Sequence, residues 1–303
     1  MKQHQLRALV AVADFGSVRA GARALSLSQT ALTKAILELE ADLHAQLLHR
    51  NAKGAQLTSI GLELVERARL ILAEIDNARA HVERFRGRTN ERVSAAASPA
   101  FFRRFLPQIV GRFRSRFPDA QLNIQDVFLS QTLPKLRDGS IDVAFTSILP
   151  ECLGNDISFE PLGSVDLALI ARRHAFPPRI DSLSQLEHEH WVLDASPCGV
   201  SEVLRREFRK LGCSVPQRIT ECSSALSTLA LVEDCGCITP TPKIVLGSKW
   251  FSSDIVELEL HNPLPAMPCG LLLRRDAKLS PAVQWMCECL RAATTLPEWA
   301  AKP

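Results

Sequence analysis

Apolar residues in the first ninety positions recur at the three- and four-residue steps of an α-helix, in short blocks separated by polar breaks. The first block, which we expect to end at Gly16, has its apolar side chains at Leu6, Leu9, Val10 and Ala13. Ser17 is a good N-cap for a short second helix that ends near residue 26, and Ser28 for a third that runs from residue 29 to about 43. Three short helices joined by tight turns predict a helix-turn-helix.

The third helix carries the most information about function. We expect it to bury Leu32, Ile36, Leu39 and Leu43, which leaves its first turns and their cap exposed with the side chains of Ser28, Gln29, Thr30, Thr33 and Lys34. Gln pairs with adenine, Thr touches a base edge or a thymine methyl, and Lys meets guanine or a phosphate. A recognition helix reads the major groove with this end. The alternative is a helix face that is merely solvated.

Residues 47–58 predict a β-hairpin, a wing whose tip carries Arg50 and Lys53 as phosphate contacts. A long helix follows, to about residue 86, with apolar residues at alternating steps of four and three: Leu64, Ala68, Ile71, Ile75, Ala78, Val82 and Phe85. This 3.5-residue seam predicts a dimer formed through the helix. The alternative is packing of the seam on the chain's own C-terminal part.

Beyond residue 90, short apolar runs alternate with amphipathic helices, which predicts an α/β domain with a largely parallel sheet. We expect strands at 92–97, 121–127, 141–146, 165–171, 191–193, 219–222, 237–239 and 270–273. The expected helices are 101–117, 132–137, 200–211, 225–233 and 280–294.

Ligands of open α/β sheets bind beyond the carboxyl ends of the strands, near helix N-termini. The positions that follow the first three strands are Ser98, Pro99, Ala100, Phe101, Phe128, Leu129, Thr146 and Ser147. Those that open helices in the later half are Ser196, Cys198, Gly199, Val200 and Ser223. Hydroxyls and free helix N-termini favour a small organic anion as the effector, with Phe101 and Phe128 able to flank an aromatic ring. The alternative is that these residues are ordinary helix caps.

Composition and charge indicate a folded protein whose N-terminal part is more basic than the rest of the chain. With 303 residues, 46% of them hydrophobic, the chain can bury a substantial core, which excludes a disordered protein. Residues 1–92 hold 14 Lys and Arg against 10 Asp and Glu, while the rest hold 22 against 23, so the basic end is where we expect a polyanionic partner. No run of roughly 18 apolar residues and no signal peptide is present, so we expect a cytoplasmic protein without a membrane partner.

Nine cysteines lie between Cys152 and Cys289, but we expect no disulfide framework in a chain without an export signal. The pairs at 235 and 237 and at 287 and 289 have poor spacing for zinc, and we interpret His188 and His190 as part of a solvated segment. Cys198, at a predicted helix N-terminus, with Cys213 closing the same segment, makes a redox sensor the alternative function. No nucleotide-binding, metalloprotease or hydrolase motif is present, so we expect neither an enzyme nor a resident cofactor.

The string GSVRAGARALSLSQTALTKAILELEADLHAQLLHRNAKGAQLTSIG, residues 16–61, resembles the DNA-binding end of the LysR-type transcriptional regulators. Thr30, Thr33, His44 and Leu48 depart mildly from the family's pattern. Thr30 and Thr33 lie on the reading face, so these two departures bear on the operator sequence rather than on the family.

The resemblance implies a winged helix-turn-helix at 1–58, a linker and dimerisation helix at 59–88, and an effector-binding domain of periplasmic-binding-protein type at 91–303. Its two α/β subdomains would comprise residues 91 to about 162 with about 266 to 303, and about 163 to 265. It further implies a homodimer, assembled into a homotetramer as a dimer of dimers, that binds double-stranded promoter DNA. A small-molecule co-inducer would change how the protein binds the promoter, and RNA polymerase is a further candidate partner. A transport-type binding protein would explain only the C-terminal part.

Overall fold

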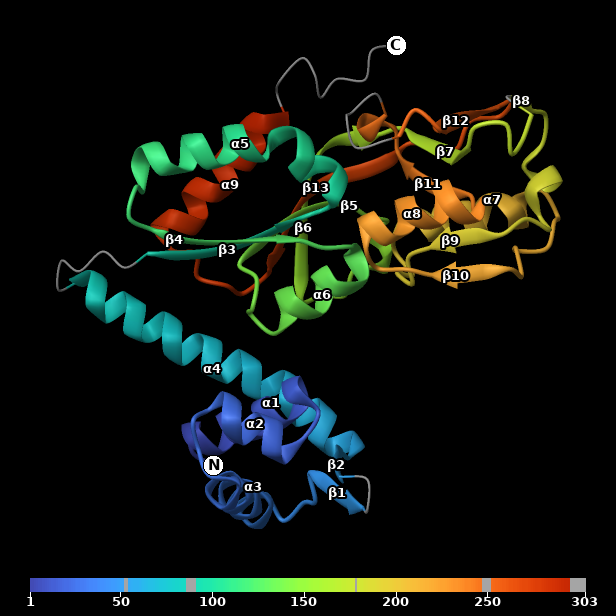
Figure 1. The fold of residues 1–303 in the computed structure, drawn as a ribbon. Helices are drawn as coiled ribbons and strands as arrows, with labels where there is room; N and C mark the ends of the chain where they lie inside the picture. Colours follow the sequence, from blue (N-terminus) through green and yellow to red (C-terminus); the bar gives the residue numbers. More distant parts are fainter. Residues whose placement is uncertain (52–53, 86–90, 178, 247–251, 295–303) are drawn as a thin grey trace. The chain divides into compact units, whose positions relative to one another are not determined.

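The computed structural model describes residues 1–51, 54–85, 91–177, 179–246 and 252–294 (Figure 1). The chain forms two compact units, one of residues 1–90 with 137–140 and one of residues 91–136 with 141–303. Each unit has its own hydrophobic core.

The first unit contains the predicted helices and hairpin. Its elements are α1 (Gln3–Phe15), α2 (Val18–Ala24), α3 (Gln29–Leu43), β1 (Leu48–Asn51), β2 (Gly54–Leu57) and α4 (Ser59–Phe85). Gly16 ends α1 in a left-handed conformation with φ of 70°. The hydroxyls of Ser17 and Ser28 accept backbone N–H bonds from the residues three positions on, so both predicted N-caps are confirmed.

The core of this unit forms around α1. Gly21 of α2 lets the two backbones approach closely, because a Cβ there would lie 3.0 Å from the carbonyl of Ala11. Leu43 is 38% exposed, which corrects its predicted burial, and Ala35 joins the buried stripe of α3 instead. Of the predicted seam on α4, Ala68 is fully buried within the unit, whereas Ile71 and Val82 are exposed.

The second unit begins with a five-stranded sheet in the order β4-β3-β5-β13-β6. Its strands are β3 (Arg92–Ala97), β4 (Gln121–Asp126), β5 (Val143–Ser147), β6 (Ile157–Val165) and β13 (Met267–Arg274). Alternate residues of β3 face opposite layers, which are α5 (Pro99–Arg116) with α9 (Pro281–Thr294) on one side and α6 (Leu129–Arg137) on the other (Figure 1).

The other subdomain is built on a four-stranded sheet in the order β11-β7-β12-β8, with β9 and β10 as a separate parallel pair. Its elements are β7 (Leu167–Arg172), β8 (Arg179–Ile180), β9 (Trp191–Leu193), α7 (Val200–Lys210), β10 (Ile219–Glu221), α8 (Ala225–Cys235), β11 (Thr239–Pro242) and β12 (Ile255–Leu260). The described residues of the two subdomains also form short 3-10 turns: η1 (Pro150–Cys152), η2 (Leu183–Leu186) and η3 (Lys243–Val245).

One prediction about this unit needs correction. The sheets are mixed rather than largely parallel, because β13 runs antiparallel to β5 and β6, and β7 antiparallel to β11 and β12. Close to the expected subdomain boundary at about residue 162, residues 163–165 still pair with β13.

Candidate functional site

A cavity of about 120 Å³ lies within the second unit, where elements of both subdomains meet. It is bordered by the N-termini of α5, α6, α7 and α8, the carboxyl ends of β5 and β9, and strand β11. A cavity needs only about 10–15 Å³ to hold one water molecule, so this cavity has room for a small organic molecule. Its position matches the rule that ligands of α/β folds bind beyond the strand ends.

Most of the predicted effector-binding residues line this cavity: Ser98, Pro99, Ala100, Phe128, Leu129, Thr146, Ser147, Gly199 and Val200. They come from the starts of three helices, with their flanking residues, and from the end of strand β5, which the fold brings together at the cavity.

Four predicted residues lie elsewhere. Phe101 is 2% exposed and stacks on Phe145 in the core, with ring centroids 3.8 Å apart, so it cannot flank a ligand. Ser196 is buried and accepts the backbone N–H of Cys198, and the Cys198 side chain is itself in the core. Ser223 is exposed just before the true cap of α8, which is Ser224.

Most of the wall that the second subdomain contributes to the cavity was not predicted from the sequence. The additional lining residues are Ile170, Val192, Leu193, Asp194, Ser201, Cys222, Ala225, Thr228, Leu229, Thr239, Pro240, Thr241, Pro242 and Val245. Asp194 directly follows β9, so the strand-end rule could have identified it. The segment 239–242 gave no such signal, because alternating Thr and Pro are not typical of a strand.

The charge of the cavity differs from what an anionic effector needs. Of the described residues that line it, Asp194 alone carries a charge, and it is negative. Asp194 Oδ1 accepts a hydrogen bond of 2.6 Å from the hydroxyl of Ser130 on α6. A Cβ on Gly199, the N-cap of α7, would lie 3.9 Å from Asp194 Oδ2. The N-terminus of α7 therefore already faces a carboxylate of the protein, which does not favour the predicted anion.

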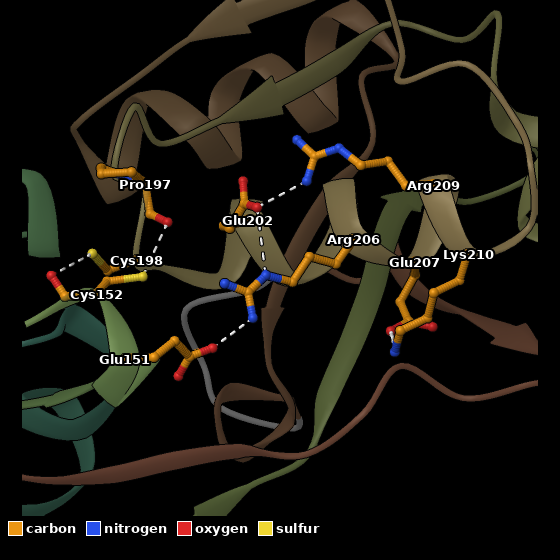
Figure 2. Close-up of polar contacts among 9 residues, drawn as sticks. All are labelled: Glu151, Cys152, Pro197, Cys198, Glu202, Arg206, Glu207, Arg209 and Lys210. Carbon is orange, nitrogen blue, oxygen red and sulfur yellow. Dashed lines mark hydrogen bonds and ion pairs between the residues drawn. The ribbon is translucent and has the colours of Figure 1, made fainter.

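Polar contacts join η1 of the first subdomain to α7 and the residues just before it in the second (Figure 2). Arg206 donates to Glu151 at 2.6 Å and also contacts Glu202, and the hydrogen bond from Arg206 holds the pKa of Glu151 below its ordinary value. The backbone N–H of Leu149 donates to the carbonyl of Cys198 at 2.9 Å. These bonds fix the two subdomains against each other at one side of the fold.

The thiol of Cys198 belongs to the same junction. Its Sγ donates to the carbonyl of Cys152 at 3.7 Å, while Cys152 Sγ donates to the carbonyl of Pro197 at the same distance (Figure 2). Cys198 and Cys213 lie beyond opposite ends of α7, whose 11 residues span roughly 16 Å at about 1.5 Å per residue. A disulfide needs Cα atoms within about 7 Å, so this predicted redox pair cannot close while α7 is folded.

Metal binding finds no support in the described part of the chain, where no cluster of three or more His, Cys, Asp or Glu side chains occurs. Cys287 and Cys289 are buried in the core on α9. Burial raises the pKa of Cys287 to about 11. His188 is exposed, and His190 shares a hydrogen bond of 2.9 Å with the hydroxyl of Thr220.

The predicted reading face of α3 is open in the first unit. Ser28, Gln29, Thr30 and Lys34 are exposed and Thr33 is half-buried. The Ser28 and Thr30 hydroxyls share a hydrogen bond of 2.9 Å, and Lys34 lies 3.9 Å from Glu38. Arg50 lies in β1, although its side chain is not described, and Lys53 lies outside the described residues.

Comparison with known proteins places both units. Residues 3–62 match a family model described as bacterial regulatory helix-turn-helix protein, lysR family, and residues 86–295 match one described as LysR substrate binding domain. The chain is 30% identical over 252 residues to the small neutral protease regulatory protein of Streptomyces coelicolor, covering 78% of this chain and 77% of that one. It is 24% identical to the regulator TdcA of Escherichia coli K12, covering 90% and 87% of the two chains.

Among solved structures, full-length CbnR in complex with its target DNA is similar, with a TM-score of 0.63, 25% identity and coverage of 97% of this chain and 100% of that one. No helix in the described ranges is both long and apolar enough to cross a membrane.

Proposed function

Because the chain belongs to the LysR family of DNA-binding transcriptional regulators, we propose that its α3 reads an operator in promoter DNA and that its cavity binds the small molecule which controls that binding. The position of the cavity supports the proposed ligand binding, because both subdomains line it with their strand ends and helix N-termini. We propose the cytoplasm as its place of action and RNA polymerase as a further partner at the promoter.

On the DNA side, the exposed start of α3 supplies the base contacts. Gln29 reads adenine, Thr30 and Thr33 contact a base edge or a thymine methyl, and Lys34 reaches guanine or a phosphate. The Ser28 hydroxyl caps the helix and orients Thr30 through their mutual hydrogen bond. Arg50 and Lys53 of the wing contact phosphates, which position the protein without reading sequence.

On the ligand side, gating needs a cavity whose occupancy changes how the two subdomains meet. The contacts between them in the described residues include the hydrogen bond from Ser130 to Asp194 at the cavity and the ion pair of Glu151 with Arg206. A ligand that binds one arrangement of the subdomains more tightly shifts the population toward it. We propose that this shift reaches the promoter through α4 and the oligomer.

Filling the cavity tests this function. Ala225 lines it at the start of α8, and Ala230 lies exposed on the same helix, so Ala225→Phe blocks the cavity while Ala230→Phe adds the same side chain outside it. We expect a thermal-shift screen of small organic compounds to yield a ligand that alters the wild-type footprint on the DNA beside the gene. Ala225→Phe should lose both responses and Ala230→Phe should keep them. A ligand response that survives in Ala225→Phe would contradict the assignment of the cavity.

A further inference from the structure

The cavity combines an apolar wall with a single carboxylate. Its apolar lining includes side chains from both subdomains: Pro99, Ala100, Phe128, Leu129, Ile170, Val192, Leu193, Val200, Leu229 and Val245. Asp194 lies among them and is partly buried. A carboxylate offers about four acceptor positions, and the described structure gives Asp194 one hydrogen bond, from Ser130 to Oδ1. Taking such a group away from water is costly unless a donor or a cation meets it.

At two of the helix N-termini around the cavity, those of α5 and α8, backbone N–H groups are absent or already hydrogen-bonded. In α5, Pro99 has no N–H, and the N–H groups of Phe101 and Phe102 already bond to the Ser98 carbonyl. In α8, the Ser224 hydroxyl accepts the N–H of Ser227. These helix starts therefore retain fewer free donors than an anion site at a helix N-terminus normally presents.

The start of α7 is already supplied with negative charge. The Asp194 carboxylate lies beside its N-cap, and Glu202 in its first turn is held by Arg206 and Arg209. A ligand carboxylate at this end of the cavity would meet a like charge in a surrounding that screens it poorly.

We propose that the effector is a small organic amine, whose apolar body fills the cavity and whose ammonium group binds Asp194 Oδ2 while Ser130 keeps Oδ1. This inference rests on the proposed function and names the ligand class of the same cavity. Ser130 lies on α6 of one subdomain and Asp194 follows β9 of the other. An amine bound to Asp194 would therefore interact with a residue that already links the two subdomains. Its positive charge would then change how the two subdomains are held together.

Matched probes of opposite charge test the ligand class. Benzylamine and butylamine, against benzoate and butyrate, keep the apolar bodies and reverse the charge. We expect isothermal titration of the purified full chain to show the amines binding at least tenfold tighter than the acids. A charge-assisted hydrogen bond to a partly buried carboxylate is worth a preference of this size.

Variants of the carboxylate separate charge from shape. Asp194→Asn keeps the volume of the side chain but removes its charge. It should weaken binding of the amines about tenfold without weakening binding of the acids. Asp181→Asn removes an exposed carboxylate in the same subdomain and should leave the preference unchanged. Ser130→Ala frees Oδ1 and should bind the amines at least as tightly as the wild type, which keeps the test open should Asp194→Asn fail to fold.

Tighter binding of the acids, or an unchanged preference in Asp194→Asn, would overturn the amine assignment and leave the cavity's regulatory role standing. Absence of binding by either class at millimolar concentration would also overturn it. The comparison of Ala225→Phe with Ala230→Phe then tests the proposed function separately.

Discussion

Single side chains at the start of α3 set how strongly the protein prefers its operator. Gln29 is exposed, and an amide that pairs bidentately with adenine is worth about 1–3 kcal/mol of discrimination. We expect Gln29→Ala to weaken operator binding roughly 10- to 100-fold while leaving binding to scrambled DNA unchanged, as measured by fluorescence anisotropy. Gln131 on α6 is also exposed, so Gln131→Ala is the control and should change neither value. Equal losses on both DNAs would show that Gln29 does not read sequence.

Of the two phenylalanines near the cavity, Phe101 is a core residue and Phe128 lines the cavity. Phe101 is 2% exposed and stacks on Phe145, so Phe101→Ala should lower the free energy of unfolding by about 3–5 kcal/mol. Phe128 is half-buried and lines the cavity, so Phe128→Ala should cost clearly less stability and instead weaken ligand binding. Urea unfolding of the two variants makes the comparison. Similar losses of stability would mean that Phe128 is a core residue as well.

At this scale the sequence locates a site better than it orients side chains. The strand-end rule led to Ser98, Thr146 and Gly199, which line the cavity, because backbone topology alone decides where strands end. It failed at Phe101 because one residue's step along a helix turns a side chain from the cavity into the core. Asp194 also follows a strand end, β9, so the rule could have located it, but its apolar surroundings come from distant parts of the chain and are not visible in the local sequence.

An ion pair between Arg291 and Glu160 joins helix α9 to strand β6. Arg291 donates to both carboxylate oxygens of Glu160 at 2.8 Å, and this bonding lowers the pKa of Glu160. A lowered pKa in the folded state means that the pair stabilises the protein at neutral pH and that this contribution disappears as the pH falls through the lowered value. Both groups are partly exposed, so we expect Arg291→Ala to cost only about 1 kcal/mol at neutral pH.

The same substitution should flatten the acid limb of the stability curve, measured by urea unfolding from pH 7 to pH 3. Glu288→Ala, which removes an exposed partner of Arg291, is the control and should keep the pH dependence. An Arg291→Ala protein with the wild-type acid limb would contradict the assignment.

Helices were predicted more completely than strands. The N-caps at Ser17 and Ser28 are local signals, readable from a few residues, and both are confirmed. Strands β6 and β12 were not predicted because their burial follows no simple alternation, as the mixed charged, polar and apolar residues of 157–165 show. The direction of β13 depends on pairing between segments more than 100 residues apart, which no local pattern encodes.

Assembly of the whole molecule depends, in our account, on the seam of α4. Ile71 and Val82 are 36% and 51% exposed, and both lie on the face that the 3.5-residue spacing predicts for a partner helix. We expect the double substitution Ile71→Asp and Val82→Asp to shift the dimer to monomer at micromolar concentration in analytical ultracentrifugation. Leu62 is 56% exposed on the opposite face of α4, so Leu62→Asp should leave the dimer intact. A dimer that survives the double substitution would move the interface away from this seam.

The central claim is that this chain binds a specific promoter sequence and that its cavity controls that binding. The most direct test is anisotropy of the full chain on the DNA beside its gene and on scrambled DNA, across a salt series, with and without a ligand found by thermal shift. We predict affinity that falls steeply with salt, a preference of roughly a thousandfold or more for the promoter, and a ligand effect that Ala225→Phe abolishes. Equal affinity for both DNAs, or a ligand effect unchanged in Ala225→Phe, would contradict the account.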